Sequence, residues 1–248
     1  HWIARPVLSA FAARGDQVAV SPPPPFVPMP RIHPEGGSVE ASPVTLSVDA
    51  PDAEIRYTTD GSVPERASTR YQEPFTLPGA SMIRVRAFTP DGGESGVSEA
   101  TFLTAANGVR YSYHEGTWQQ LPDFETVPSV REGQMTTFDL GAVPKRADYY
   151  AVRFEAYLEI TEAGTYTFYV MVDDGANLYL DGEHLVDNDG PGGARERSRT
   201  ASLEPGRHHL IVDYFETYGD ETLKVRYEGP GLEKQTIPAR RLYLSDED

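Results

Sequence analysis

The sequence has no cysteine among its 248 residues. Disulfide bonds, zinc–thiolate centres and a thiol nucleophile are therefore excluded, and the composition is compatible with a bacterial extracytoplasmic protein. No apolar run approaches the roughly 18 residues that a membrane-spanning helix needs. The chain starts at His1 without Met and has no signal-peptide apolar segment, so we expect any such peptide to lie upstream.

Positive charge is scarce. The chain carries 22 Lys and Arg against 38 Asp and Glu, which gives a net charge of −16. Such a surface repels phosphate, so we expect no nucleic-acid partner and no membrane insertion. Gly (22 residues) and Pro (21 residues) are frequent, which favours many short strands joined by turns over long helices.

The first 29 residues differ in pattern from the rest. The spacing of Trp2, Ile3, Val7, Leu8 and Phe11 predicts one short amphipathic helix over residues 1–20. Pro22 to Pro25, followed by Pro28 and Pro30, form an extended, stiff linker. We interpret residues 1–29 as the end of an upstream domain plus its Pro-rich linker.

Residues 30–105 and 106–248 predict two all-β domains. In the first, residues 44–48 and 83–87 alternate apolar and polar side chains between turn signals such as Asp60-Gly61. In the second, alternation recurs over 149–160, 166–172, 178–180, 210–214 and 223–227. We predict a small immunoglobulin- or fibronectin-like sandwich followed by a larger antiparallel β-sandwich.

Residues 30–104 resemble the chitobiase/β-hexosaminidase C-terminal domain. The similarity rests on the stretch Ile55–Pro64 (IRYTTDGSVP), with support from 34–37, 71–75, 83–87 and 98–102. The resemblance implies a small sandwich attached to secreted glycosidases and other surface proteins, without catalysis of its own.

Residues 107–244 resemble the domain named after the fourteen-kilodalton piece of anthrax protective antigen. The similarity rests on 113–118, 121–124, 166–169, Asp173-Asp174-Gly175 with 178–182, and 203–216. The resemblance implies a β-sandwich that occurs in bacterial glycosidases, yeast adhesins and toxins. Several members bind carbohydrate, and calcium takes part in the adhesin-type lectins.

A candidate ligand site follows from this second resemblance. In the adhesin-type lectins the peptide bond between the paired acids, here Asp173 and Asp174, is cis, and both carboxylates ligate calcium. Their third side-chain ligand is an Asn in a loop that corresponds to residues 214–220, where this sequence offers Glu216. Calcium prefers six to eight oxygen ligands, so we predict a Ca²⁺ site of Asp173, Asp174 and Glu216. The alternative is that the two Asp side chains accept backbone N–H bonds and only hold loops in place.

Aromatic residues could complete a sugar site. Tyr218 and Trp118 are candidates to stack on a sugar ring, with core packing as the alternative for Trp118. Asn188 and Asp189 are interpreted as turn residues. His208 and His209 are neighbours on one strand and should face opposite ways, which argues against joint metal binding, so zinc is not expected.

Catalytic signatures are missing from the sequence. We therefore predict a non-catalytic C-terminal accessory region of a secreted or surface glycan-active enzyme, binding glycan through the second sandwich with possible help from calcium. Its partners would be a polysaccharide and an upstream catalytic domain of the same polypeptide, and its location extracytoplasmic. The alternatives are a pair of structural spacers that bind no ligand, or part of a hexosaminidase-type glycoside hydrolase whose catalytic domain lies upstream.

Overall fold

The structure is a computed structural model that describes residues 26–40 and 43–247. The helix expected over residues 1–20 and most of the Pro-rich linker lie outside the described residues. Within them the regular secondary structure is nearly all β-strand, and the helical elements are two three-residue 3-10 turns, η1 (Leu140–Ala142) and η2 (Ala239–Arg241). Across the same residues, none of the helical segments has the length and apolar character needed to cross a membrane. The all-β prediction is confirmed.

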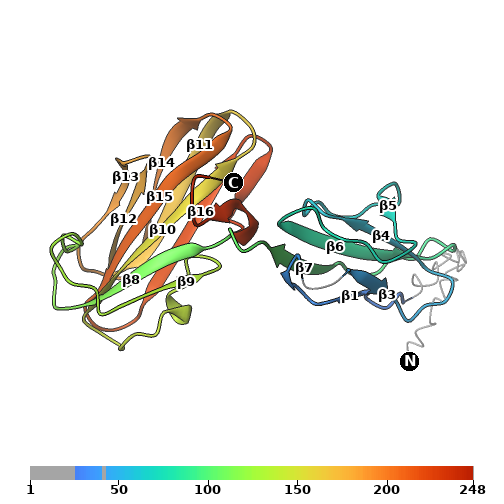
Figure 1. The fold of residues 1–248 in the computed structure, drawn as a ribbon, viewed down its shortest axis with the longest axis horizontal. Coiled ribbons are helices and arrows are strands. Elements are labelled where there is room, and N and C mark those ends of the chain that lie inside the picture. The colour runs from blue at the N-terminus through green and yellow to red at the C-terminus, as the bar shows by residue number, and fades with distance from the viewer. Residues whose placement is uncertain (1–25, 41–42, 248) are drawn as a thin grey trace, which may run out of the picture.

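The first half of the chain forms a small two-layer β unit (Figure 1). Its strands are β1 (Arg31–His33), β2 (Gly37–Ser38), β3 (Thr45–Ser47), β4 (Glu54–Thr58), β5 (Thr69–Arg70), β6 (Ser81–Phe88) and β7 (Ser98–Leu103). They make a five-stranded sheet in the order β2-β7-β6-β4-β5 and a two-stranded sheet of β1 and β3. The predicted alternation is visible on β6, where Ile83 and Val85 are fully buried between the sheets and Arg84 and Arg86 face outward.

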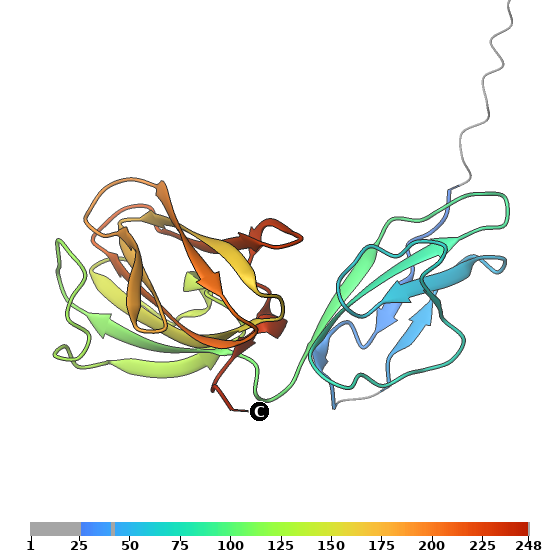
Figure 2. The same cartoon turned by 90° about the horizontal axis from the view of Figure 1, so that it is seen from above.

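The second half forms a larger sandwich of two sheets (Figures 1 and 2). One sheet has the order β13-β12-β15-β10-β8-β9, with β18 added beside β10, and the other has the order β14-β11-β16-β17. The bounds are β8 (Val109–Glu115), β9 (Arg131–Met135), β10 (Tyr150–Ile160), β11 (Gly164–Asp173), β12 (Gly175–Leu180), β13 (Glu183–Asn188), β14 (Arg195–Leu203), β15 (Gly206–Glu216), β16 (Thr222–Gly229), β17 (Leu232–Thr236) and β18 (Leu242–Tyr243).

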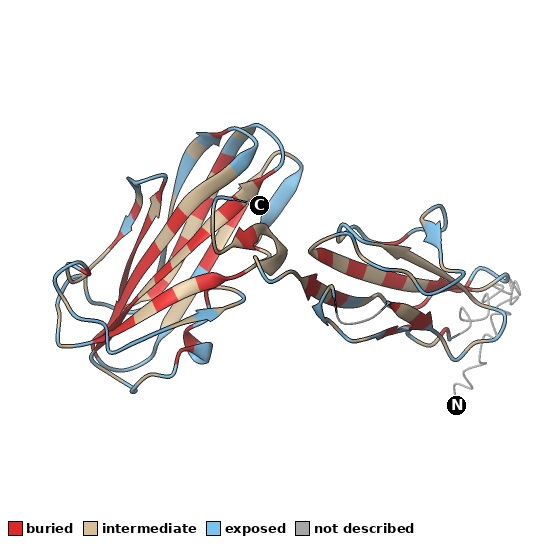
Figure 3. Ribbon diagram, viewed as in Figure 1, coloured by how far each residue is buried: buried red, intermediate tan, exposed pale blue. Residues whose placement is uncertain are grey.

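The period-2 alternation of these strands builds the core of the larger sandwich. On β10, Val152, Phe154, Ala156 and Leu158 are buried, while Arg153, Glu155 and Tyr157 face the other side of the sheet. The facing sheet contributes Phe168, Val170 and Val172 from β11. The buried residues, red in Figure 3, run as alternating bands along the central strands. Removing these side chains from water is the main force that holds the two sheets together.

The junction between the two halves is short and hydrogen-bonded. The side-chain oxygen of Asn107 accepts from the Thr104 N–H at 2.9 Å, and its amide nitrogen donates to the Leu242 carbonyl at 3.1 Å. Across the junction, Arg240 Nη2 donates to the Asp60 carbonyl oxygen at 2.9 Å. These contacts tie the C-terminal end of the second sandwich to a turn of the first.

Candidate functional site

Two loops meet at one end of the larger sandwich. β11 ends at Asp173 and β12 begins at Gly175, so Asp174 joins the two sheets. β15 ends at Glu216, and the loop 217–221 leads into β16. Strand pairing brings these loops together, because Asp173 pairs with Thr222 and Gly175 pairs with Phe215. The Asp173–Asp174 peptide bond is cis, as the resemblance implies.

Asp174 is buried and links three segments of this end. Its Oδ1 accepts from the Gly192 N–H at 2.8 Å, and its Oδ2 accepts from the Thr217 N–H at 2.8 Å and from the Thr217 hydroxyl. The side chain is only 5% exposed. These bonds match the loop-holding role named above as an alternative. They leave lone pairs on both oxygens, because each carboxylate oxygen can accept more than one bond.

Glu216 is the least satisfied acid of the group. It is 1% exposed, and its Oε1 is buried without a hydrogen-bond partner among the described residues. Burial raises the pKa of Glu216 from its ordinary 4.5 to about 7, and the charges of Asp174 and Asp173 add to the effect. The pKa of Asp173 is raised for the same two reasons, burial first and the charge of Asp174 second. The three predicted ligands therefore lie close enough to repel one another.

A layer of tyrosines lies beneath the acids. The Tyr214 hydroxyl is 2.6 Å from both the Asp173 carbonyl oxygen and Glu216 Oε2. The Tyr150 hydroxyl donates to Glu221 Oε2 at 2.5 Å, and Lys145 Nζ lies 2.9 Å from Glu221 Oε1. Burial raises the pKa of both Tyr150 and Tyr214, so both remain neutral hydrogen-bond donors at physiological pH. This layer fixes the position of Glu216 from below.

The donor set suits a hard cation, although the acids are not gathered around one point. Over the described residues, no group of three His, Cys, Asp or Glu side chains has the arrangement of a metal centre. The argument for a cation is the type of donor atom. A buried carboxylate oxygen without a partner lies beside two other acids, and a divalent cation would relieve the repulsion among them. Carboxylate oxygens are the ligands that calcium prefers. The set Asp173, Asp174 and Glu216 stays a prediction.

Two exposed tyrosines flank the acids. Tyr218 is 73% exposed directly beside the Asp174–Thr217 contact, as its predicted role requires. Tyr149 is 42% exposed with φ of 60°, and its N–H donates to the Thr217 carbonyl at 3.0 Å. The sequence does not point to Tyr149, because alternation places it in the strand that begins at Tyr150. Its place beside the acids becomes evident only when the loop that follows β15 is known to lie next to the start of β10.

Trp118 has a different environment from Tyr218. Its partly buried ring packs with Leu121 against a cluster of Phe124, Ala151 and Phe215. Gly116 lies so close that an added Cβ would be 2.4 Å from the indole. The contacts are those of the core-packing alternative, and a sugar contact through the exposed part of the ring stays a prediction.

Asn188 was interpreted wrongly as a turn residue. It is the last residue of β13, it is fully buried, and its side-chain amide donates to the carbonyls of Val170 at 3.0 Å and Arg195 at 3.2 Å. It therefore connects the two sheets beneath the loop. Asp189 does lie in the loop, where its Oδ1 accepts from the Leu121 and Gly190 N–H groups.

Comparison with known proteins identifies both halves. Residues 34–99 match the chitobiase/beta-hexosaminidase C-terminal domain, and residues 107–241 match the PA14 domain. The anti-sigma-I factor RsgI3 of Acetivibrio thermocellus is 31% identical over 145 residues, which are 56% of this chain but only 22% of that protein.

Solved structures similar to this chain include an anti-sigma factor protein and a PA14 domain of an adhesin. An anti-sigma factor domain-containing protein shares 28% identity with a TM-score of 0.48, covering 57% of this chain and 49% of that one. A structure titled PA14 sugar-binding domain from RTX adhesin shares 17% identity with a TM-score of 0.47, covering 57% of this chain and 100% of that one. Because the PA14 match spans more than half of the residues, this chain belongs to the PA14 domain family.

Proposed function

We propose that the larger sandwich binds carbohydrate at the loop end around Asp174, and that Ca²⁺ completes the site. The observation that carries this proposal is the buried Oε1 of Glu216, which has no partner among the described residues and lies beside two more acids and under exposed aromatic residues. Proteins rarely leave a buried polar atom unpaired without a reason, and an ion is one of the usual reasons.

Each residue then has a defined part in binding. Asp173, Asp174 and Glu216 would hold the ion, and the ion would supply a positive centre that sugar hydroxyls can approach. Tyr214 positions Glu216, and Asp174 positions the loop that carries Tyr218 through its bonds to Thr217. Tyr218 offers its ring to the apolar C–H face of a sugar.

The proposed cellular role is that of a non-catalytic, extracytoplasmic accessory region. It would hold a parent polypeptide against polysaccharide, and a glycan-active enzyme is the parent that we proposed from the sequence. The relation to an anti-sigma-I factor favours a second class of parent, a regulatory protein. The contacts of Asp174 favour one other function, a structural spacer in which the acids only hold loops.

A glycan array probed with the full chain separates these functions. On the array's mono- and disaccharides, we expect binding in millimolar CaCl₂ that EDTA abolishes. We expect about tenfold weaker binding by Tyr218→Ala, because a packed aromatic ring is among the largest single contributions to such an interface. The matched control is Leu232→Ala, which removes another exposed apolar side chain on β17. Absence of any bound glycan in calcium would support the spacer, and equal binding in EDTA would contradict the role of the ion.

A further inference from the structure

The outer face of the larger sheet carries ordered rows of polar and ring side chains. The strand register places six outward residues in one row, namely Glu132, Ser112, Arg153, Asp213, Asn177 and Asp187. The next row runs Gln134, Arg110, Glu155, Ile211, Tyr179 and His184. With strands about 4.8 Å apart, five steps from β9 to β13 span about 24 Å. The face is therefore long enough for an extended chain.

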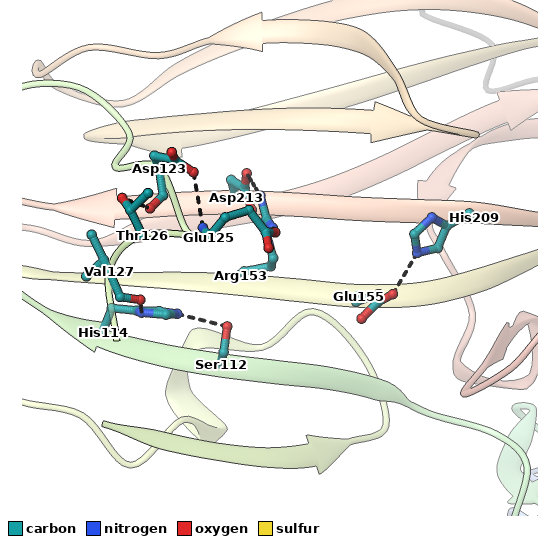
Figure 4. A network of polar contacts seen from close by, with 10 residues as sticks. All are labelled: Ser112, His114, Asp123, Glu125, Thr126, Val127, Arg153, Glu155, His209 and Asp213. Atoms are coloured by element: carbon teal, nitrogen blue, oxygen red, sulfur yellow. Dashed lines mark hydrogen bonds and ion pairs between the residues drawn. The ribbon is translucent and has the colours of Figure 1, made fainter. Parts of the chain in front are cut away.

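Arg153 is the centre of an ion-paired cluster on this face. Arg153 makes two hydrogen bonds to Asp213, at 2.8 and 3.0 Å, and a third to Glu125 at 2.9 Å. Glu155 lies 2.8 Å from His209 Nε2 (Figure 4). Groups bonded in this way are held in fixed positions and present hydrogen-bond donors and acceptors. A protein partner usually requires an apolar centre, which this row does not provide.

Ring side chains lie along the same face. Tyr157 stacks on His209 with ring centroids 4.9 Å apart, and Tyr179 stacks on His184 at 4.8 Å. Tyr179 pairs with Ile211, which lies two residues from His209 on β15. The two stacked ring pairs are therefore diagonal neighbours across β10, β15, β12 and β13. Rings that are already packed lose little freedom when a ligand is added.

The face is hollowed at one end and open to solvent. A hollow of about 510 Å³ lies over β9, β8 and β10 and is lined by Arg110, Ser112, Glu132, Gln134, Arg153 and Glu155. The side chains of Arg153, His209 and Glu155 are 26%, 30% and 38% exposed. The loop 116–128 covers the end of the face nearest to Asp174, through Phe124 over Ala151 and Phe215. It also reaches Arg153, through the Phe124 ring and Glu125, and Asp213 and Asn177 of the first row are buried. The hollow and the ring pairs are thus accessible together.

We propose that this sheet face, here called the β9–β13 face, is a second binding surface that takes a neutral polysaccharide chain laid across the strands. The occupant is a neutral glycan because the fixed polar groups and the tyrosine rings suit sugar hydroxyls and C–H groups. Acidic polymers are repelled, because acids outnumber bases on this face and the whole chain has a net charge of −16. The surface does not use the loop end around Asp174 and needs no cation.

Affinity electrophoresis of the full chain tests the surface. Gels would contain xyloglucan, mixed-linkage β-glucan, arabinoxylan or galactomannan, all with EDTA so that a calcium-dependent site contributes nothing. We expect at least one polymer to retard the wild type, and we expect Tyr157→Ala combined with Tyr179→Ala to weaken that binding about tenfold. Free monosaccharides should not compete, because one ring spans only part of the face.

Two further variants make the result decisive. Gln134→Trp fills the hollow without removing a core contact and should also weaken retardation, so that loss of binding is not confused with loss of folding. Tyr169→Ala removes a ring from the outer face of the other sheet, where it donates to Glu228 at 2.6 Å, and should leave retardation unchanged. No retardation by any of the four polymers, retardation that survives both β9–β13 face variants, or equal loss in Tyr169→Ala would overturn the proposal. None of these outcomes bears on the calcium-dependent site.

Discussion

Replacing Asp174 with Ala is expected to abolish calcium binding and to lower the free energy of unfolding by about 3 kcal/mol. The change removes a predicted ligand, and it also leaves the N–H groups of Gly192 and Thr217 without their acceptor. A buried donor without a partner costs about 1–3 kcal/mol. Urea denaturation gives the stability, and calorimetric titration with CaCl₂ gives the affinity.

The matched control is Asp174→Asn. The amide keeps one oxygen that can still accept from Thr217, but its NH₂ group faces the Gly192 N–H and the charge is lost. The variant should therefore lose less stability than Asp174→Ala while calcium binding falls steeply. Loss of stability in both variants with full calcium binding would mean that Asp174 only holds loops. Unchanged stability in Asp174→Ala would show that the three hydrogen bonds of this side chain contribute nothing.

Calcium is expected to reverse the pH dependence of stability. The folded-state pKa of Glu216, about 7, lies above its ordinary 4.5, so between these values the folded chain binds more protons than the unfolded chain. In chelator, stability must therefore fall as pH rises from 4.5 to 7, by at most about 3 kcal/mol for this group. Asp173, whose pKa is also raised, acts in the same direction.

In saturating calcium the slope of stability against pH changes sign. The ion binds the ionised carboxylates, so its contribution to stability grows as pH rises. Thermal unfolding is measured at pH 5, 6, 7 and 8, once in EDTA and once in calcium. The two curves of unfolding temperature against pH should move apart as the pH rises. Glu216→Gln removes the titrating group and should flatten the chelator curve. Parallel curves in the two conditions would exclude an ion at these acids.

Much of the fold could be predicted because strand alternation is a local property. The run 150–160 places every second side chain on one face, and the structure buries those side chains as expected. The strands β9 and β14 carry no such signal, since β14 has the mixed polar sequence RERSRTASL and lies at a sheet edge. An edge strand buries little of either face, so its sequence is weakly constrained.

The candidate site could be predicted only in part. Asp173 and Asp174 are neighbours in the sequence, and the resemblance pointed to the loop that carries Glu216. The support of Glu216 by Tyr214, and the pairing of Tyr150 with Glu221, depend on which strands lie side by side. The position of Tyr149 also depends on strand arrangement, because its N–H bonds to Thr217, which lies 68 residues further along the chain. The rows of the β9–β13 face likewise follow from register, which alternation alone does not fix.

Calorimetric titration of CaCl₂ into the full chain, side by side with Glu216→Gln, tests the central claim most directly. The account predicts one calcium ion per wild-type chain and at least about tenfold weaker binding by the variant, because the buried Oε1 of Glu216 would be a direct ligand. Glu99→Gln, at an exposed acid of the first sandwich, should bind as the wild type does. No heat from the wild type, or equal affinity in Glu216→Gln, would contradict the account.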